Sequence, residues 1–208
     1  LLALLLNETK SRFKRFSQTV LYAPHFISMV VMVGMLNTLF SPTMGVINTL
    51  REALGMERYY YMAQPSAFRH LYVWSGVWQN IGWDAVMYLA ALSAVDPSLH
   101  EAAMIDGASR IQRITHINLP TILPTIVILF IMAVGRVASV GYEKVYLLQN
   151  DLNVDVSEVI STYVYKRGVL NSNYSFSTAV GLFNNVVNIA LLLMANFISR
   201  RLGETSLF

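Results

Sequence analysis

The chain has 208 residues, of which 55% are hydrophobic and only 13% are charged, about half the charge of a typical soluble domain. Its 15 lysines and arginines exceed its 12 acidic residues by a net charge of only +3, which is too small an excess to indicate nucleic-acid binding. The absence of cysteine excludes disulfides, thiolate metal sites and a cysteine nucleophile. These values predict an integral membrane protein with an all-α fold.

Four windows are apolar enough to form membrane-spanning helices, each of which needs about 20 mostly apolar residues. We expect spans at 20–40, 70–95, 119–140 and 177–199. Residues 1–7 are typical of the end of a further span, because LLALLLNE lacks the basic start of a signal peptide. We therefore expect a polytopic membrane helix bundle, one transmembrane domain over 1–208, with four complete spans, the end of a fifth, and an incomplete N-terminus.

Lysine and arginine in the loops give a weak signal for orientation. Residues 7–19, 96–118 and the tail after Ser199 fall on one side and carry eight of these residues, against six on the other side. We expect a bacterial cell membrane as the location, and the charge bias favours an orientation in which the loop at 96–118 and the C-terminus lie in the cytoplasm. Because the difference is small, the opposite orientation stays open on charge alone.

The loop between the second and third complete spans carries the clearest local signals. Asp96 is a helix N-cap residue and Pro97 suits the first turn of the helix that follows. Gly107 allows a turn with positive φ, and the segment 109–118 can form a second short helix before Pro120 opens the next span. The sequence predicts a helix–turn–helix elbow at the membrane surface.

This loop resembles the EAA loop of ABC-importer permease subunits, whose pattern is EAA---G---------I-LP. Every fixed position of that pattern is matched here, by Glu101, Ala102, Ala103, Gly107, Ile117, Leu119 and Pro120. The stretches KRF, QTVLYAPHFIS, WQNIGWDAVMYLAALSAVDPSLHEAAMIDGAS, VISTYVYKRG and YSFSTAVGLFNNVVN are similar to the LplB-type permeases for polysaccharide-derived sugars, so the resemblance covers nearly the whole chain. It implies the fold of a type I ABC importer permease.

The resemblance also implies a function and a set of partners. The matched residues would form a coupling helix that docks on a separate ATPase subunit, which would hold the ATP and Mg²⁺. Further implied partners are a second permease subunit in a heterodimer, an extracellular solute-binding lipoprotein, the sugar and membrane lipid, but no nucleic acid. The chain itself would bind no cofactor.

No catalytic pattern is present in the sequence. It lacks the phosphate-binding loop G-x-x-x-x-G-K-[ST], and it lacks H-E-x-x-H and G-x-S-x-G. Its four histidines are scattered, and none has a second metal ligand at helical spacing. We therefore expect no catalytic residue and no metal site, and a transport subunit rather than an enzyme.

Polar residues inside the expected spans are candidates for the substrate pathway, because such residues usually face a bundle interior or a wet cavity. Asn80, Asp84 and Tyr88 have the i, i+4, i+8 spacing of one helix face. The candidates are Asn80, Trp83, Asp84, Tyr88, Arg136, Tyr142, Glu143 and Asn184. Amide, carboxylate and aromatic groups suit a sugar, but an ion pair between Asp84 and Arg136 that only fixes the helices is an equally good interpretation.

Two other functions remain open at this point. An ABC permease for a different solute, such as amino acids or peptides, would carry the same EAA loop, and only the flanking resemblance favours sugar. A membrane scaffold or channel subunit without an ATPase partner is the alternative from a different class.

Overall fold

The computed structural model describes residues 1–201 and 206–207 of the chain, and those residues contain helices but no strand. They form two compact units. Unit 1 comprises 1–23, 80–138 and the described chain from 185 onward, and unit 2 comprises 24–79 and 139–184. The prediction of a single transmembrane domain stays a prediction.

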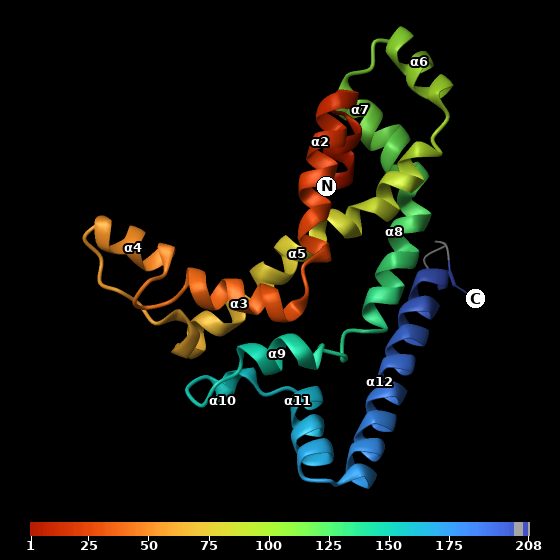
Figure 1. Cartoon of the computed structure of the whole chain (residues 1–208). Coiled ribbons are helices and arrows are strands. Elements are labelled where there is room, and N and C mark those ends of the chain that lie inside the picture. The colour runs from red at the N-terminus through yellow and green to blue at the C-terminus, as the bar shows by residue number, and fades with distance from the viewer. Residues whose placement is uncertain (202–205, 208) are drawn as a thin grey trace. The chain divides into compact units, whose positions relative to one another are not determined.

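Unit 1 contains the loop at 96–118 together with the helices on either side of it. Its elements are α1 (Leu2–Asn7), α2 (Ser11–Tyr22), the second half of α5 (Pro65–Ser93), α6 (Pro97–Ile105), α7 (Arg110–Arg113), the π-helix η3 (Ile114–Asn118), α8 (Leu119–Val134) and the later part of α12 (Tyr174–Arg201) (Figure 1). Ala3, Ala85, Leu92 and Ile122 form its buried apolar cluster. The residues come from α1, α5 and α8, so this cluster joins three helices.

Two glycines allow helices of unit 1 to pack closely. A Cβ added to Gly82 in α5 would overlap the backbone carbonyl of Leu21 in α2. A Cβ added to Gly135, directly after α8, would lie 2.8 Å from Cδ1 of Leu192 in α12. Both positions therefore need glycine for the observed helix separation.

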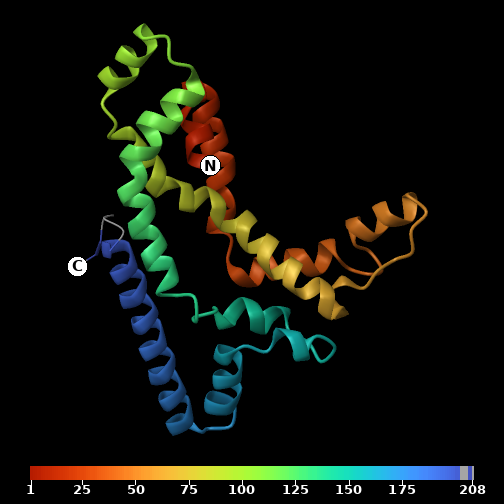
Figure 2. The same ribbon diagram turned by 180° about the vertical axis from the view of Figure 1, so that it is seen from behind.

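Unit 2 consists of shorter elements joined by irregular segments. They are the 3₁₀ turn η1 (Ala23–Phe26), α3 (Met29–Leu39), α4 (Val46–Ala53), the 3₁₀ turn η2 (Tyr61–Ala63), the first half of α5, α9 (Tyr142–Leu148), α10 (Val154–Ser157), α11 (Ile160–Tyr165), the π-helix η4 (Lys166–Leu170) and the start of α12 (Figure 2). Its buried cluster is Val33, Met62, Phe68, Val145 and Leu148. These residues join α3, η2, α5 and α9 across a long sequence separation.

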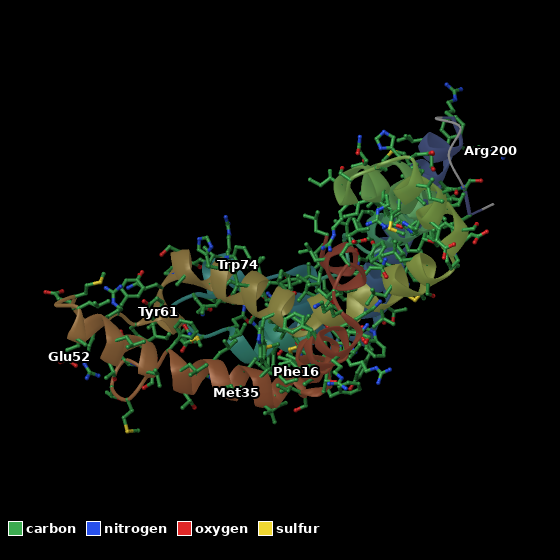
Figure 3. All side chains as sticks on the ribbon, turned by 90° about the horizontal axis from the view of Figure 1, so that it is seen from above. Phe16, Met35, Glu52, Tyr61, Trp74 and Arg200 are labelled. Carbon is green, nitrogen blue, oxygen red and sulfur yellow. The ribbon has the colours of Figure 1, made fainter. Side chains whose placement is uncertain are left out.

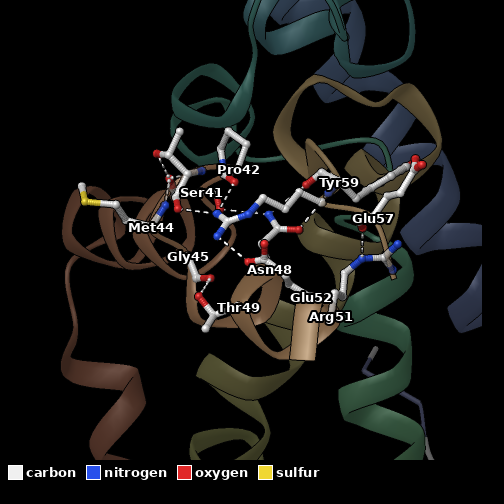
Figure 4. A network of polar contacts seen from close by, with 12 residues as sticks. Ser41, Pro42, Met44, Gly45, Asn48, Thr49, Arg51, Glu52, Glu57 and Tyr59 are labelled. Carbon is white, nitrogen blue, oxygen red and sulfur yellow. Dashed lines mark hydrogen bonds and ion pairs between the residues drawn. The ribbon is translucent and has the colours of Figure 1, made fainter. Parts of the chain in front are cut away.

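A fully buried asparagine holds the segment around α4 in place (Figure 4). The side-chain amide of Asn48 donates to the carbonyls of Ser41 (2.9 Å) and Tyr59 (3.0 Å), and its oxygen accepts from the Tyr59 N–H at 2.8 Å. Arg58 donates to the carbonyls of Pro42 and Thr43 and forms a 2.7 Å ion pair with Glu52. The asparagine satisfies backbone groups that have no helix or sheet to bond to.

A second buried asparagine does the same for the segment after α9. The Asn153 amide donates to the carbonyls of Met62 (3.0 Å) and Leu148 (3.1 Å). Its oxygen accepts from the Asn150 N–H and from the Ser157 hydroxyl, both at 3.0 Å. This loop is therefore tied to η2 and to the end of α9.

Two helices of the described chain are long and apolar enough to cross a membrane by themselves, at 110–134 and 174–201. The expected spans at 119–140 and 177–199 lie on these helices, although α8 ends at Val134. The segment expected to end a span at 1–7 is helical as α1. The tail after Ser199 continues α12 to Arg201, and its residues 202–205 and 208 lie outside the described residues.

The other two expected spans have different shapes. The window 20–40 is not one straight helix, because the helices on either side of Ile27 meet at 98° and pass the length and composition test only as a pair. Ser28 caps the second helix by accepting from the Val31 N–H, which starts a new helix there. The window 70–95 lies on α5 as far as Ser93, where the helix ends. The 29 residues of α5 are long enough to span a membrane, but they include several polar side chains. For this reason α5 is not one of the two helices that pass the test by themselves.

Candidate functional site

The loop expected to carry the function begins with the capped helix α6. Asp96 precedes it in an extended conformation, and its carboxylate accepts from the Ser98 N–H at 2.9 Å. The hydrogen bonds from Ser98 lower the pKa of the Asp96 carboxyl, so the residue is ionised at the positive end of the helix. Pro97 occupies the first turn, as the sequence predicted.

Gly107 makes the turn after α6. Its φ is +78°, and the N–H of Ala108 donates to the Ala103 carbonyl at 2.8 Å. Ser109 then starts α7 with a capping box, in which its hydroxyl accepts from the Gln112 N–H and the Gln112 side chain accepts from the Ser109 N–H. The predicted helix–turn–helix elbow is confirmed at these residues, and it projects as a short arm in Figure 1.

The second helix of the elbow is not separate from the following span, which corrects the expectation that Pro120 begins a new element. The described helix runs without a break from Arg110 to Val134. It passes through the π-turn η3, in which the Leu119 N–H donates to the carbonyl of Ile114. Proline has no N–H for an α-helical bond to the residue four positions earlier, so a π-turn before Pro120 reduces the mismatch. The second helix of the elbow is thus continuous with α8.

The matched EAA positions lie mostly at the surface of unit 1. Glu101, Ala102, Gly107, Leu119 and Pro120 are exposed, and Ala103 and Ile117 are half-buried. Around them lie exposed apolar side chains: Leu99, Met104, Ile105 and Ile111. Ile105 is 87% exposed, so the elbow presents apolar side chains beside the matched EAA positions.

The polar residues predicted for α5 share a helix, as their spacing required. Asn80, Asp84 and Tyr88 all lie within the uninterrupted α5, and Trp83 beside them is 45% exposed. Asp84 is exposed, and within the described chain it has no ion-pair or hydrogen-bond partner. Its carboxylate is therefore available to a ligand.

The proposed ion pair between Asp84 and Arg136 is absent from the part of the chain that the structure describes. Arg136 is exposed in the turn that follows α8. Both residues belong to unit 1. The interpretation that the two side chains only fix the helices to each other is not supported.

The remaining predicted residues lie in unit 2. Tyr142 and Glu143 begin α9 and are exposed, and Asn184 is half-buried on α12. Tyr142 stacks on Tyr165 of α11, with ring centroids 5.1 Å apart. The sequence prediction missed Tyr165, because 23 positions separate it from Tyr142 and no pattern links the two.

Unit 2 also contains an apolar groove of about 490 Å³ between α3 and α5. Met35, Tyr61 and Trp74, labelled in Figure 3, are among its lining residues. His70 and Ser75 are its few polar neighbours, and almost no polar surface faces the groove. It does not have the hydrogen-bonding groups that a sugar requires.

A comparison with known protein families shows to which family the chain belongs. Residues 1–204 match the family described as "Binding-protein-dependent transport system inner membrane component". The chain belongs to this family. The resemblance of the EAA loop and its flanks to ABC-importer permeases is thereby confirmed, and the family is a transport component rather than a catalytic subunit.

Two relatives with curated descriptions are similar to this chain over its whole length. The chain is 42% identical to the polygalacturonan/rhamnogalacturonan transport system permease protein YteP of Bacillus subtilis, over 100% of this chain and 65% of that protein. It is also 42% identical to protein LplB of the same organism, over 100% of this chain and 66% of LplB. The chain thus spans about two thirds of the length of these relatives.

Solved structures show the same fold. A bacterial alginate ABC transporter, in complex with an alginate pentasaccharide-bound periplasmic protein, has a chain that is 41% identical, with a TM-score of 0.93 over 99% of this chain and 72% of that chain. The predicted all-α fold of an ABC importer permease is therefore confirmed.

Proposed function

We propose that this protein is the membrane-spanning subunit of an ATP-driven importer for oligosaccharides. The observation that carries this proposal is the exposed, capped elbow at 96–109 joined to a continuous apolar helix. A carbohydrate solute is supported by the names of two similar proteins, the polygalacturonan/rhamnogalacturonan transport permease YteP and the alginate ABC transporter.

The elbow has the properties of a coupling element. Its exposed apolar residues and Glu101 form a surface for a separate ATPase subunit, which would supply ATP, Mg²⁺ and hydrolysis. Because α7, η3 and α8 form one helix, movement of the elbow would be transmitted directly to the span. The loop and the C-terminus would then lie in the cytoplasm.

Further partners complete the transporter. A second permease subunit, in a heterodimer, would form the other half of the pathway, and an extracellular binding lipoprotein would deliver the sugar. Transport requires that the sugar's affinity differ between the two states of the membrane subunits. On this chain Asn80, Asp84 and Tyr88 in unit 1 are one proposed set of sugar contacts, together with Trp83 of the same helix and Arg136, which follows α8. Tyr142, Glu143 and Asn184 in unit 2 are the other.

The decisive experiment is reconstitution of the full-length subunit with its ATPase, partner permease and binding protein in liposomes. Uptake of a labelled oligogalacturonide or alginate oligosaccharide is measured with and without ATP. We expect uptake only with ATP, and we expect Glu101→Lys or Gly107→Pro to abolish it while the binding protein keeps its sugar affinity. Proline cannot adopt the φ of +78° at position 107.

Glu57→Lys is the matched control, because Glu57 is also an exposed glutamate but lies outside the elbow. It should retain uptake. Wild-type uptake by the Glu101→Lys protein would refute the coupling role of the elbow. A folded protein that copurifies with no ATPase would instead favour the scaffold or channel function.

A further inference from the structure

Three tyrosine rings lie together on α9 and α11 in unit 2. Tyr165 is the central ring, stacked on Tyr142 at 5.1 Å and set edge-on to Tyr146 at 5.2 Å. The centroids of Tyr142 and Tyr146 are 6.5 Å apart. We call Tyr142, Tyr146 and Tyr165 the tyrosine cluster.

The tyrosine cluster lies at the surface of unit 2 and outside its buried apolar cluster. Tyr142 is 44% and Tyr146 38% exposed, and Tyr165 between them is half-buried. Within the described chain the three hydroxyl groups make no hydrogen bond, so they are open to water or to a ligand. The ring surfaces that are not stacked on one another offer apolar contact beside these polar groups.

The surrounding contacts hold the rings in place before a ligand arrives. The Ser161 hydroxyl donates to the Val140 carbonyl at 2.7 Å, which ties α11 to the segment before α9. The Lys166 ammonium, next to Tyr165, donates to Gln149 at 2.6 Å and to Glu158 at 2.9 Å. A preorganised aromatic surface binds with a smaller entropy cost than a mobile one.

Polar side chains continue the aromatic row at the end of α9. Tyr142 and Tyr146 have the i, i+4 spacing of one face of α9, and Gln149 is the C-cap residue that directly follows the helix. Gln149, Lys166 and Glu158 form a hydrogen-bonded group at one end of this row. The result is an aromatic platform beside an amide, an ammonium and a carboxylate.

We propose that the tyrosine cluster binds a sugar ring of an oligosaccharide, a site that deepens the proposed function and rests on it. One side of a sugar ring presents C–H groups that pack on aromatic faces, and its edge presents hydroxyls that pair with amide and charged groups.

The first test needs no substitution. The full chain in nanodiscs of deuterated lipid is irradiated at aromatic proton frequencies, and saturation transfer to an added oligosaccharide is measured by NMR. An alginate pentasaccharide and an arabino-oligosaccharide of similar length are the two probes. We expect transfer to the ring C–H protons of at least one probe. Transfer to both assigns neutral and acidic sugars to the site, and transfer only to alginate assigns uronates. No transfer to either probe overturns the proposal.

The second test assigns the signal to the cluster. Tyr165→Leu should reduce the transfer at least fivefold, whereas Tyr165→Phe, which keeps the ring, should stay within twofold of wild type. Tyr163→Leu is the matched control, because Tyr163 lies on the same helix and is 41% exposed but packs on Phe176 instead. Equal transfer in Tyr165→Leu and wild type, or an equal loss in Tyr163→Leu, overturns the proposal.

Uptake by the reconstituted transporter separates this inference from the proposed function. ATP-dependent uptake with an unchanged KM in Tyr165→Leu would refute the role of the cluster in transport and leave the importer function intact. Saturation transfer at the cluster without any ATP-dependent uptake by wild type would refute the importer function and leave the sugar site intact.

Discussion

Units 1 and 2 of this protein are held together in different ways. In unit 1 the long helices approach until backbone meets backbone, as at Gly82 and Leu21, and the buried cluster contains only apolar side chains. In unit 2 two buried asparagines, Asn48 and Asn153, bond to carbonyl groups in irregular segments. Long helices satisfy their own backbone groups and need only close packing, whereas short helices and loops need buried amides to replace water.

The largest effect should come from closing the tightest contact of unit 1. Gly82→Ala places a methyl group on the Leu21 carbonyl, which is backbone and cannot rotate away, so we expect a loss of about 3 kcal/mol in the free energy of unfolding. Gly34→Ala is the control, because nothing lies within 4 Å of its added Cβ in α3. It should be neutral or stabilise by up to about 1 kcal/mol through helix propensity. Thermal unfolding in detergent measures both, and similar melting temperatures would show that the close contact is not required.

The second prediction compares a buried asparagine from each unit. Asn153→Leu leaves the Leu148 carbonyl without its donor and removes one of the two amide donors to the Met62 carbonyl, which keeps that of Asn150. We expect a loss of about 2 kcal/mol. Asn118 in unit 1 is equally buried, but neither of its side-chain polar atoms has a partner within the described chain. Asn118→Leu should therefore be neutral or stabilising. Chemical unfolding of the two variants tests the contrast, which fails if Asn118→Leu is the more destabilised.

The sequence predicted the elbow well because its signals are local. The cap at Asp96 and the turn at Gly107 depend only on neighbouring residues, and both are confirmed. The π-turn before Pro120 was missed because proline was interpreted as a helix start, although it also fits within a helix that changes its hydrogen-bonding pattern.

Features that depend on tertiary contacts could not be predicted. The 98° bend within 20–40 interrupts a window without any charged residue, so the mean hydropathy of the window gives no sign of it. The contact of Tyr142 with Tyr165 joins two helices whose packing no spacing rule specifies. The roles of the predicted pathway residues stay predictions for the same reason.

A smaller effect should follow from changing the backbone freedom at Gly107. Gly107→Ala meets no neighbouring atom within 4 Å, but its φ of +78° is unfavourable for a residue with a Cβ, so we expect a cost of about 1 kcal/mol. Gly107→Asn should cost less, because asparagine tolerates positive φ. Limited proteolysis of the elbow should follow the order alanine, asparagine, glycine, from most to least cleaved. Equal cleavage of all three would indicate that the turn can relax.

The smallest effect concerns the pH dependence of unit 2. Lys144 on α9 is buried against Tyr72, and desolvation lowers the pKa of its ammonium from 10.5 to about 8. Between these two values the unfolded state binds more protons than the folded state, so stability should rise with pH across that window and be lowest below pH 8.

Lys144→Met should remove this rise and raise the melting temperature at pH 7. Lys166→Met is the control, because the Lys166 ammonium pairs with Glu158 at 2.9 Å and its removal should not stabilise the protein. Melting temperatures at pH 7 and pH 10 compare the variants. A rise with pH that persists in Lys144→Met would assign it to another group.

The π-turn at 114–118 has a consequence for the direction in which the elbow faces. A π-turn is equivalent to one residue inserted into an α-helix, and each residue of an α-helix advances the chain by about 100° around the axis. This single insertion therefore sets the rotational phase between the residues before it and the membrane helix after it. A protein that lacked one residue here would keep its cap, its glycine turn and its apolar span, but would direct Glu101 toward a different side of the helix axis.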